Sequence, residues 1–86
     1  NQMKEETTNI GNHRFTMGIY SDDNGESYYS QIEHLESGLT ASLDALKYDK
    51  GFIDETGDIF EVEKYIIDTI DCFISDMFLQ VENNNQ

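Results

Sequence analysis

The sequence predicts an α+β domain in which an N-terminal antiparallel β-hairpin, at about residues 13–36, packs on two helices. The helices expected are a short one at about 40–49 and a long amphipathic one at about 59–81. Three observations carry this prediction: an Asn-Gly pair between alternating apolar residues, leucines at helical spacing, and a broad apolar stripe near the C-terminus. With 86 residues, the chain has room for one hydrophobic core.

The hairpin prediction rests on the turn signal Asn24-Gly25. This pair favours a two-residue loop whose central residues both take positive φ. With Asn24-Gly25 as the loop, Asp23 faces Glu26 and Met17 faces Ile32, and the apolar residues share one face: Phe15, Met17, Ile19, Tyr28 and Ile32. A rival interpretation starts a helix near Ser27, because another apolar set falls at helical spacing: Tyr28, Ile32, Leu35, Leu39, Leu43 and Leu46.

The short helix at 40–49 is predicted from the spacing of Leu39, Leu43 and Leu46, at i, i+4 and i+7. Gly51 stands just past its end, where glycine commonly stops a helix. Residues 52–57 then form a connection, and a short third strand is an alternative near 52–60.

The long helix at 59–81 is the strongest element of the pattern. Asp58 is a candidate N-cap, and Glu61 three residues later completes a capping-box spacing. Its apolar stripe is broad and must lie against the rest of the domain: Val62, Ile66, Ile70, Phe73, Met77 and Val81.

Both ends of the chain are polar. Residues 1–12 have no apolar period and are expected to form a flexible tail, and residues 83–86 a disordered one. A single acidic domain is therefore expected at 13–82. No apolar run approaches the length of a membrane span, and one cysteine cannot form an internal disulfide, so we expect a cytoplasmic protein.

Acidic residues dominate the composition. Eighteen Asp and Glu stand against five Lys and Arg, which gives a formal net charge of −13 at pH 7. Binding to nucleic acid by counterion release requires basic residues, and anionic membrane surfaces attract basic segments. The composition therefore excludes direct binding to nucleic acid or to a membrane surface.

The sequence offers little for catalysis. Cys72 is the one thiol, and on a helical wheel it lies beside Asp68 and Asp71, whose charges repel the thiolate that nucleophilic chemistry needs. Arg14 is the one arginine, and no glycine-rich phosphate loop is present. We therefore expect no enzymatic activity and no cofactor.

Metal sites are expected to be absent as well. In the predicted register, His13 faces Glu36 and lies diagonal to His34, a set that lacks a fourth ligand for a zinc-type ion. Two acidic loops resemble calcium loops but place Tyr20 or Phe52 at the first ligand position. Exposed strand histidines and solvated carboxylates are the simpler interpretation.

The acidic surface is the remaining functional signal. Carboxylates one helical turn apart stand about 5.4 Å from each other, comparable with successive phosphates of a nucleic acid. A helix surface that serves stability normally interleaves Lys or Arg with Glu, and this one scarcely does. The predicted partner-binding residues are those of the hairpin tip, the 52–58 connection and the last helix, with nearby tyrosines as anchors: Asp22, Asp23, Glu26, Tyr20, Tyr28, Tyr29, Asp54, Glu55, Asp58, Asp68 and Asp71.

In size and charge, the chain resembles phage-encoded inhibitors of host defence, such as anti-CRISPR proteins and other DNA mimics. That resemblance implies a non-enzymatic inhibitor in the host cytoplasm that blocks the basic nucleic-acid-binding surface of a nuclease or effector complex. The chain also resembles small acidic immunity proteins, which implies an antitoxin that neutralises a basic nuclease toxin. A further alternative is an oligomerisation or subunit module, including a homodimer, since the apolar side of the last helix is wide.

Overall fold

The computed structural model describes residues 2–84, and the side chains of 3–83. These residues form seven strands and one helix: β1 (Gln2–Ile10), β2 (His13–Asp22), β3 (Gly25–His34), β4 (Thr40–Ser42), β5 (Leu46–Tyr48), β6 (Gly51–Ile53), β7 (Ile59–Glu61) and α1 (Lys64–Asn84). The predicted α+β class is confirmed, with one helix in place of two in the described part of the chain.

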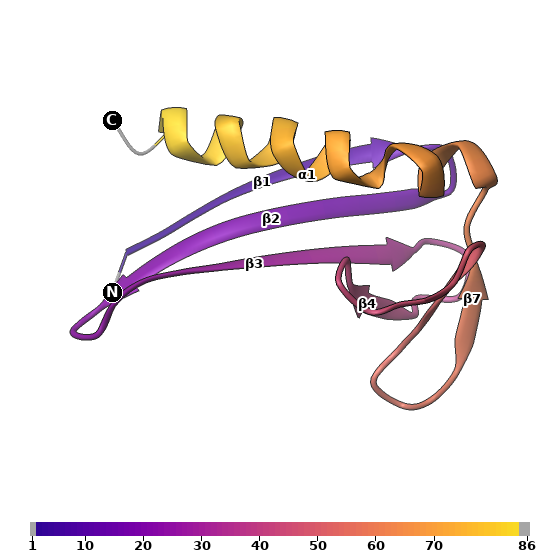
Figure 1. The fold of residues 1–86 in the computed structure, drawn as a ribbon. Helices are drawn as coiled ribbons and strands as arrows, with labels where there is room; N and C mark the ends of the chain where they lie inside the picture. The colour runs from indigo at the N-terminus through magenta and orange to yellow at the C-terminus, as the bar shows by residue number, and fades with distance from the viewer. Residues whose placement is uncertain (1, 85–86) are drawn as a thin grey trace.

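The strands form two antiparallel sheets. The larger has the order β1-β2-β3-β4, and the smaller has the order β5-β6-β7. Figure 1 shows α1 running along β1 and β2 of the larger sheet, with the smaller sheet below the N-terminal end of the helix. The β2–β3 turn therefore lies far from the smaller sheet along the length of the molecule.

The predicted hairpin exists, but its register is wrong by two residues. Asp23 and Asn24 form the loop, and Met17 faces Ser30 where Ile32 was expected. The Asn24 amide donates a hydrogen bond to Asp22 Oδ1 at 2.8 Å, and the positive φ that the turn requires, 113°, falls on Gly25. A shift of two residues keeps every side chain on its face, which is why the predicted core residues of these strands are buried: Phe15, Met17, Ile19 and Ile32.

Residues 1–12 are not a tail over the described range. Gln2–Ile10 form strand β1 and pair with His13–Ser21, all but the last residue of β2. The strand is almost entirely polar, because one of its edges and much of its surface face solvent, so an apolar period could not reveal it. At the other end, Asn83 and Asn84 belong to α1, whereas residues 85–86 of the expected tail, like residue 1, lie outside the described residues.

The helix predicted at 40–49 is also wrong. The segment contains β4 and β5, joined by a turn in which the Asp44 amide donates to Ser42 Oγ at 3.2 Å. Ala41 and Leu43 are buried, but Leu46 is 41% exposed, so the three leucines do not form one buried stripe. Pairing of β4 with the preceding strand β3 satisfies the backbone of this segment and overrides the leucine spacing.

Helix α1 begins at Lys64, five residues later than expected, because Ile59–Glu61 pairs with β6 as strand β7. Asp58 is therefore not the N-cap. The Glu63 carbonyl accepts the first helical hydrogen bond, from the Ile67 amide at 3.1 Å. The region 52–60, where one short strand was expected, contains most of a β6–β7 hairpin.

Two clusters of buried side chains hold the layers together. One joins the smaller sheet, the larger sheet and the first half of α1: Phe15, Ile32, Ala41, Leu43, Phe52, Phe60, Val62, Ile66 and Ile70. The other joins β2 to the second half of α1: Met17, Ile19, Met77 and Val81. Together they fix the helix along its whole length against β2.

A glycine in β2 makes room for an aromatic ring on the opposite face of the sheet. Tyr29 stands directly across from Gly18 in the β2–β3 register, and Glu5 stands across from Gly18 on the other side. The Tyr29 ring lies over Gly18 and its hydroxyl donates a hydrogen bond to Glu5. Burial, followed by the Glu5 hydrogen bond, raises the pKa of Tyr29 to about 12.

Gly18→Ala is expected to destabilise the protein by about 1 kcal/mol. The added Cβ would lie 2.3 Å from the Tyr29 ring, so the ring must move and give up Glu5. Urea denaturation of a double-mutant cycle with Tyr29→Ala measures this coupling. In the Tyr29→Ala background the substitution should cost nothing, and an equal cost in both backgrounds would contradict the explanation.

Candidate functional site

The predicted residues at the β2–β3 turn divide between exposed and packed positions. Asp22, Asp23 and Glu26 are exposed at the turn. Tyr20 is 41% exposed, whereas Tyr29 is half-buried over the sheet. The turn therefore offers three carboxylates with Tyr20 as the accessible aromatic group, and Tyr29 has a structural contact of its own.

Tyr28 connects the β2–β3 hairpin to the second half of α1. Its ring lies 4.9 Å from that of Phe78 between centroids, and its hydroxyl donates a hydrogen bond to Glu82. That hydrogen bond raises the pKa of Tyr28 to about 12. Phe78 and Glu82 were not among the predicted site residues, although their spacing of four places both on one flank of the helix.

The hairpin and the helix thus form one acidic end of the molecule, defined here as residues 17–30 and 71–84. The two segments are held side by side by the Met17, Ile19, Met77 and Val81 cluster and by the Tyr28–Phe78 ring pair. They carry six carboxylates and no Lys or Arg: Asp22, Asp23, Glu26, Asp71, Asp76 and Glu82. The neighbouring strand β1 contributes one basic residue to the described part of the chain, Lys4, which pairs with Ile19 of β2.

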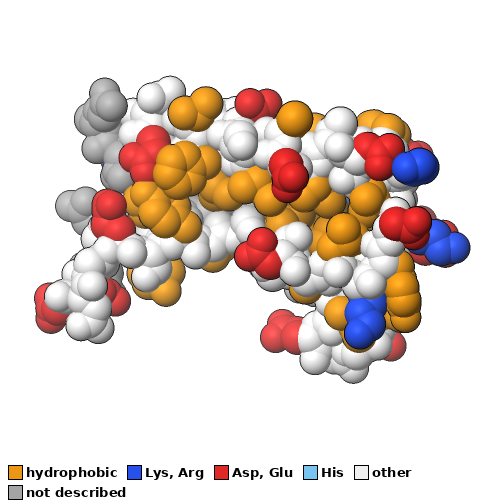
Figure 2. Space-filling model, viewed as in Figure 1, with side chains coloured by type: hydrophobic (Ala, Val, Ile, Leu, Met, Phe, Trp, Pro, Cys, Tyr) orange, Lys and Arg blue, Asp and Glu red, His pale blue; other side chains and the backbone are white. Residues whose placement is uncertain are grey.

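The distribution of charge over the molecule is uneven. Figure 2 shows acidic side chains along both edges of a hydrophobic band between α1 and the larger sheet, with Lys and Arg gathered toward the end where α1 begins. Ion pairs are present there, between Arg14 and Glu33 at 3.2 Å and between Lys64 and Asp68 at 3.1 Å. The basic residues thus compensate carboxylates mainly at the end away from the β2–β3 turn.

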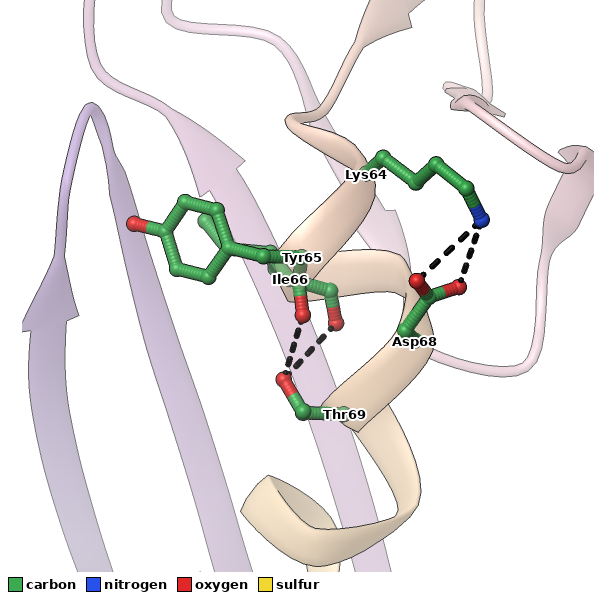
Figure 3. Close-up of polar contacts among 5 residues, drawn as sticks. All are labelled: Lys64, Tyr65, Ile66, Asp68 and Thr69. Carbon is green, nitrogen blue, oxygen red and sulfur yellow. Dashed lines mark hydrogen bonds and ion pairs between the residues drawn. The ribbon is translucent and has the colours of Figure 1, made fainter.

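The pair formed by Lys64 and Asp68 changes the interpretation of the helix carboxylates. Both Asp68 oxygens accept hydrogen bonds from Lys64 Nζ at 3.1 Å (Figure 3). In the next turn, Thr69 Oγ1 donates to the Tyr65 carbonyl at 2.7 Å. Asp68 therefore has a cation of its own, whereas Asp71 is exposed in the acidic end.

The acidic connection between β6 and β7 does not join the acidic end. Asp54 is 8% exposed, and its Oδ1 accepts hydrogen bonds from the Thr56 hydroxyl, the Thr56 amide and the Asp58 amide. These bonds, the Thr56 side chain first, lower the pKa of Asp54. Asp54 organises the loop, while Glu55 and Asp58 are exposed at the smaller sheet, so the three predicted acidic clusters do not form one patch.

The two histidines meet across the sheet, but in a different pairing from the predicted one. His13 faces His34, with ring centroids 5.4 Å apart, and Glu36 instead accepts a hydrogen bond from Asn12. A hollow of about 210 Å³ beside them is lined by Asn12, His13, His34, Glu61, Val62 and Glu63. In residues 2–84, no group of three His, Cys, Asp or Glu side chains is arranged to hold a metal ion.

Burial lowers the pKa of His13, which is 2% exposed. The positive charge of His34 acts in the same direction, while the Glu61 carbonyl and the Glu63 carboxylate oppose it. His34 is more accessible, and its Nδ1 lies 2.7 Å from Ser37 Oγ. Burial in the core beside Phe60 therefore favours the neutral form of His13.

Cys72 is exposed on α1. No described helix combines the length and apolar character needed to cross a membrane.

No family model, curated protein or solved structure matches this chain.

Acidification is expected to destabilise the protein through His13. In the unfolded chain His13 takes up a proton near pH 6.5, whereas in the folded protein its lowered pKa delays protonation to a lower pH. The contribution of neutral His13 to the free energy of unfolding is therefore complete above pH 6.5 and is lost as the pH falls through the lowered pKa. Urea denaturation between about pH 7.5 and pH 5 should show a larger loss for the wild type than for His13→Phe. His34→Gln is the matched control: it removes the smaller effect of the His34 charge on the His13 pKa but keeps the burial of His13, so it should retain most of the wild-type loss. A stability difference between wild type and His13→Phe that does not change with pH would contradict the prediction.

Proposed function

We propose that this protein is a non-enzymatic inhibitor that binds the basic nucleic-acid-binding surface of another protein, such as a nuclease or an effector complex. The observation that supports the proposal is the acidic end, where carboxylates of the β2–β3 hairpin and of α1 stand together without Lys or Arg in either segment. A surface of this kind attracts a cationic partner over a distance and repels nucleic acid.

The cost of this arrangement supports a selected role. Like charges held together destabilise the folded state, and the net charge of −13 is large for 86 residues. The two segments that carry the six carboxylates of the acidic end are held together by the buried apolar contacts between β2 and α1. Association with a basic surface would relieve that repulsion, because each carboxylate would gain a cation.

Aromatic groups stand among the carboxylates. Tyr28 and Phe78 are 43% and 38% exposed on the α1 side of the sheet, and Tyr20 is 41% exposed on the other side. Exposed aromatic rings are the side chains that most often anchor protein–protein interfaces, whereas rim carboxylates chiefly set the association rate. The acidic end therefore has both parts of a docking surface for a protein.

The proposal is tested by competition with DNA. The protein is titrated into complexes of basic nucleases with a fluorescein-labelled duplex, and fluorescence anisotropy reports displacement of the DNA. We expect displacement at low salt that is lost as ionic strength rises to about 0.5 M. If the protein displaces the duplex from none of the basic nucleases at low salt, the proposed inhibitor function is contradicted.

Two matched variants separate the acidic end from total charge. Neutralising the turn, by Asp22→Asn, Asp23→Asn and Glu26→Gln together, should weaken displacement by about tenfold. Neutralising three carboxylates near the smaller sheet, by Asp49→Asn, Glu55→Gln and Asp58→Asn, changes the net charge equally and should weaken it much less. Equal losses would show that net charge alone matters and would remove the acidic end from the interface.

A further inference from the structure

Helix α1 covers only part of the sheet on which it packs. Its contacts with the larger sheet are chiefly with β1 and β2 (Figure 1). A helix is about 10 Å wide and neighbouring strands are about 4.8 Å apart, so one helix covers about two strands. The α1-facing side of β3 is therefore left without a helix beyond the region that the smaller sheet covers.

A groove follows this uncovered strip. It has a volume of about 370 Å³ and is lined by Met17, Tyr28, Tyr29, Ser30, Ser42, Asp44 and Ile74. Figure 2 shows the hydrophobic band between α1 and the sheet on this face. Ile74 of α1 is half-buried, and Phe78 one turn later is 38% exposed. Apolar atoms of the helix therefore remain at the surface along this strip. We refer to this feature as the α1–β3 groove.

Carboxylates surround the apolar part of the groove. Asp44 lies in its lining, and Glu82 stands at the Tyr28 end, where it accepts the tyrosine hydroxyl. Asp71 and Glu82 have the spacing that places them on the same flank of α1 as Ile74 and Phe78. The lining contains no Lys or Arg.

We propose that the α1–β3 groove binds a basic amphipathic helix of the partner protein, laid beside α1. The apolar stripe of that helix would cover Ile74, Phe78 and the Tyr28 ring, and its flanking Lys and Arg would meet the surrounding carboxylates. This assignment rests on the proposed function, since it names the segment of a basic partner that the acidic end takes.

The uncovered strip of β3 is long enough for a short helix. Tyr28, Tyr29 and Ser30 line the groove, and the stretch of β3 from the turn at Gly25 to Ser30 extends for about 20 Å at 3.3 Å per residue. A helix of about 14 residues spans the same length. A second helix at the normal interaxial distance of 8–10 Å from α1 would complete the helical layer over the sheet.

Charge selects this occupant over a second copy of the chain. Another copy would bring a further net charge of −13 to a groove already surrounded by carboxylates, and its own helix carries Asp68, Asp71 and Asp76. A basic helix removes that repulsion and buries the same apolar surface. The groove is thus complementary to a segment whose charge is opposite to that of α1.

The test uses a fluorescein-labelled peptide of about 14 residues, with leucines at alternating spacings of three and four and with Lys and Arg elsewhere. A peptide of the same composition with its leucines scrambled is the control. Anisotropy should show at least tenfold tighter binding of the amphipathic peptide, and amide shifts in the ¹⁵N spectrum of the protein should centre on Met17, Tyr28 and Ile74. Equal binding of the two peptides would overturn the proposal, because charge alone would explain it.

Adjacent helix positions provide a matched pair of variants. Phe78→Asp adds a charge beside the groove, one turn after Ile74, and should weaken peptide binding at least tenfold. Leu79→Asp adds the same charge at a position that is 59% exposed and should change binding less than twofold. If Phe78→Asp disturbs the fold, Asp44→Lys tests the lining at an exposed side chain, with Asp58→Lys as its control. Equal effects within both pairs would overturn the groove assignment.

The outcomes separate this inference from the proposed function. DNA displacement that depends on the turn carboxylates but not on Phe78 or Asp44 would retain the acidic inhibitor and overturn the groove. If the peptide binds in the groove but the protein displaces DNA from none of the nucleases, the groove assignment is retained and the proposed inhibitor function is overturned. A dimer in sedimentation velocity that Phe78→Asp dissociates would show that a second copy occupies the groove and would also overturn the assignment.

Discussion

The burial of α1 against β2 is the contact on which the rest of the structure depends. Met17 and Ile19 of the strand meet Met77 and Val81 of the helix, and Phe15 continues the contact toward the first half of α1. Without this layer, the sheet would expose its apolar face and the carboxylates of the hairpin and helix would separate. Hydrophobic burial is nearly independent of charge, so it can hold together segments that electrostatics drives apart.

The face assignment could be predicted from the sequence because strand alternation needs no tertiary information. The pattern from Phe15 to Ile32 predicts which side chains are buried even when the register is wrong by two residues. The register itself depends on whether Asn24 and Gly25 both take positive φ or Gly25 alone does, and the hydrogen bond from the Asn24 amide to Asp22 accompanies the second arrangement. Strand β1 pairs with β2 across the two-residue Gly11-Asn12 turn, and β4 pairs with β3 across residues 35–39, so both partners are near in the sequence. Neither strand has the apolar alternation on which the prediction relied.

The candidate site was predictable to a similar degree. Composition and turn chemistry place Asp22, Asp23 and Glu26 at an exposed tip, and the structure agrees. What a carboxylate does once exposed depends on its neighbours: Asp68 is paired with Lys64, and Asp54 binds its own loop. These contacts depend on the folded structure. The sequence alone therefore does not distinguish a carboxylate that stabilises the fold from one that is available to a partner.

Charge and shape contribute different parts of recognition. Exposed carboxylates accelerate the approach of any cationic protein, but they discriminate poorly among cationic proteins, since the field depends on total charge more than on its detail. A groove between two elements discriminates by fit, because a helix that places its apolar stripe wrongly leaves Ile74 and Phe78 partly in water. An acidic protein without the groove would bind basic partners indiscriminately, and the groove without its carboxylates would favour self-association of the same apolar surface. The proposed specificity therefore requires both features on the same face, and the packing of α1 on one side of the sheet is what brings them together.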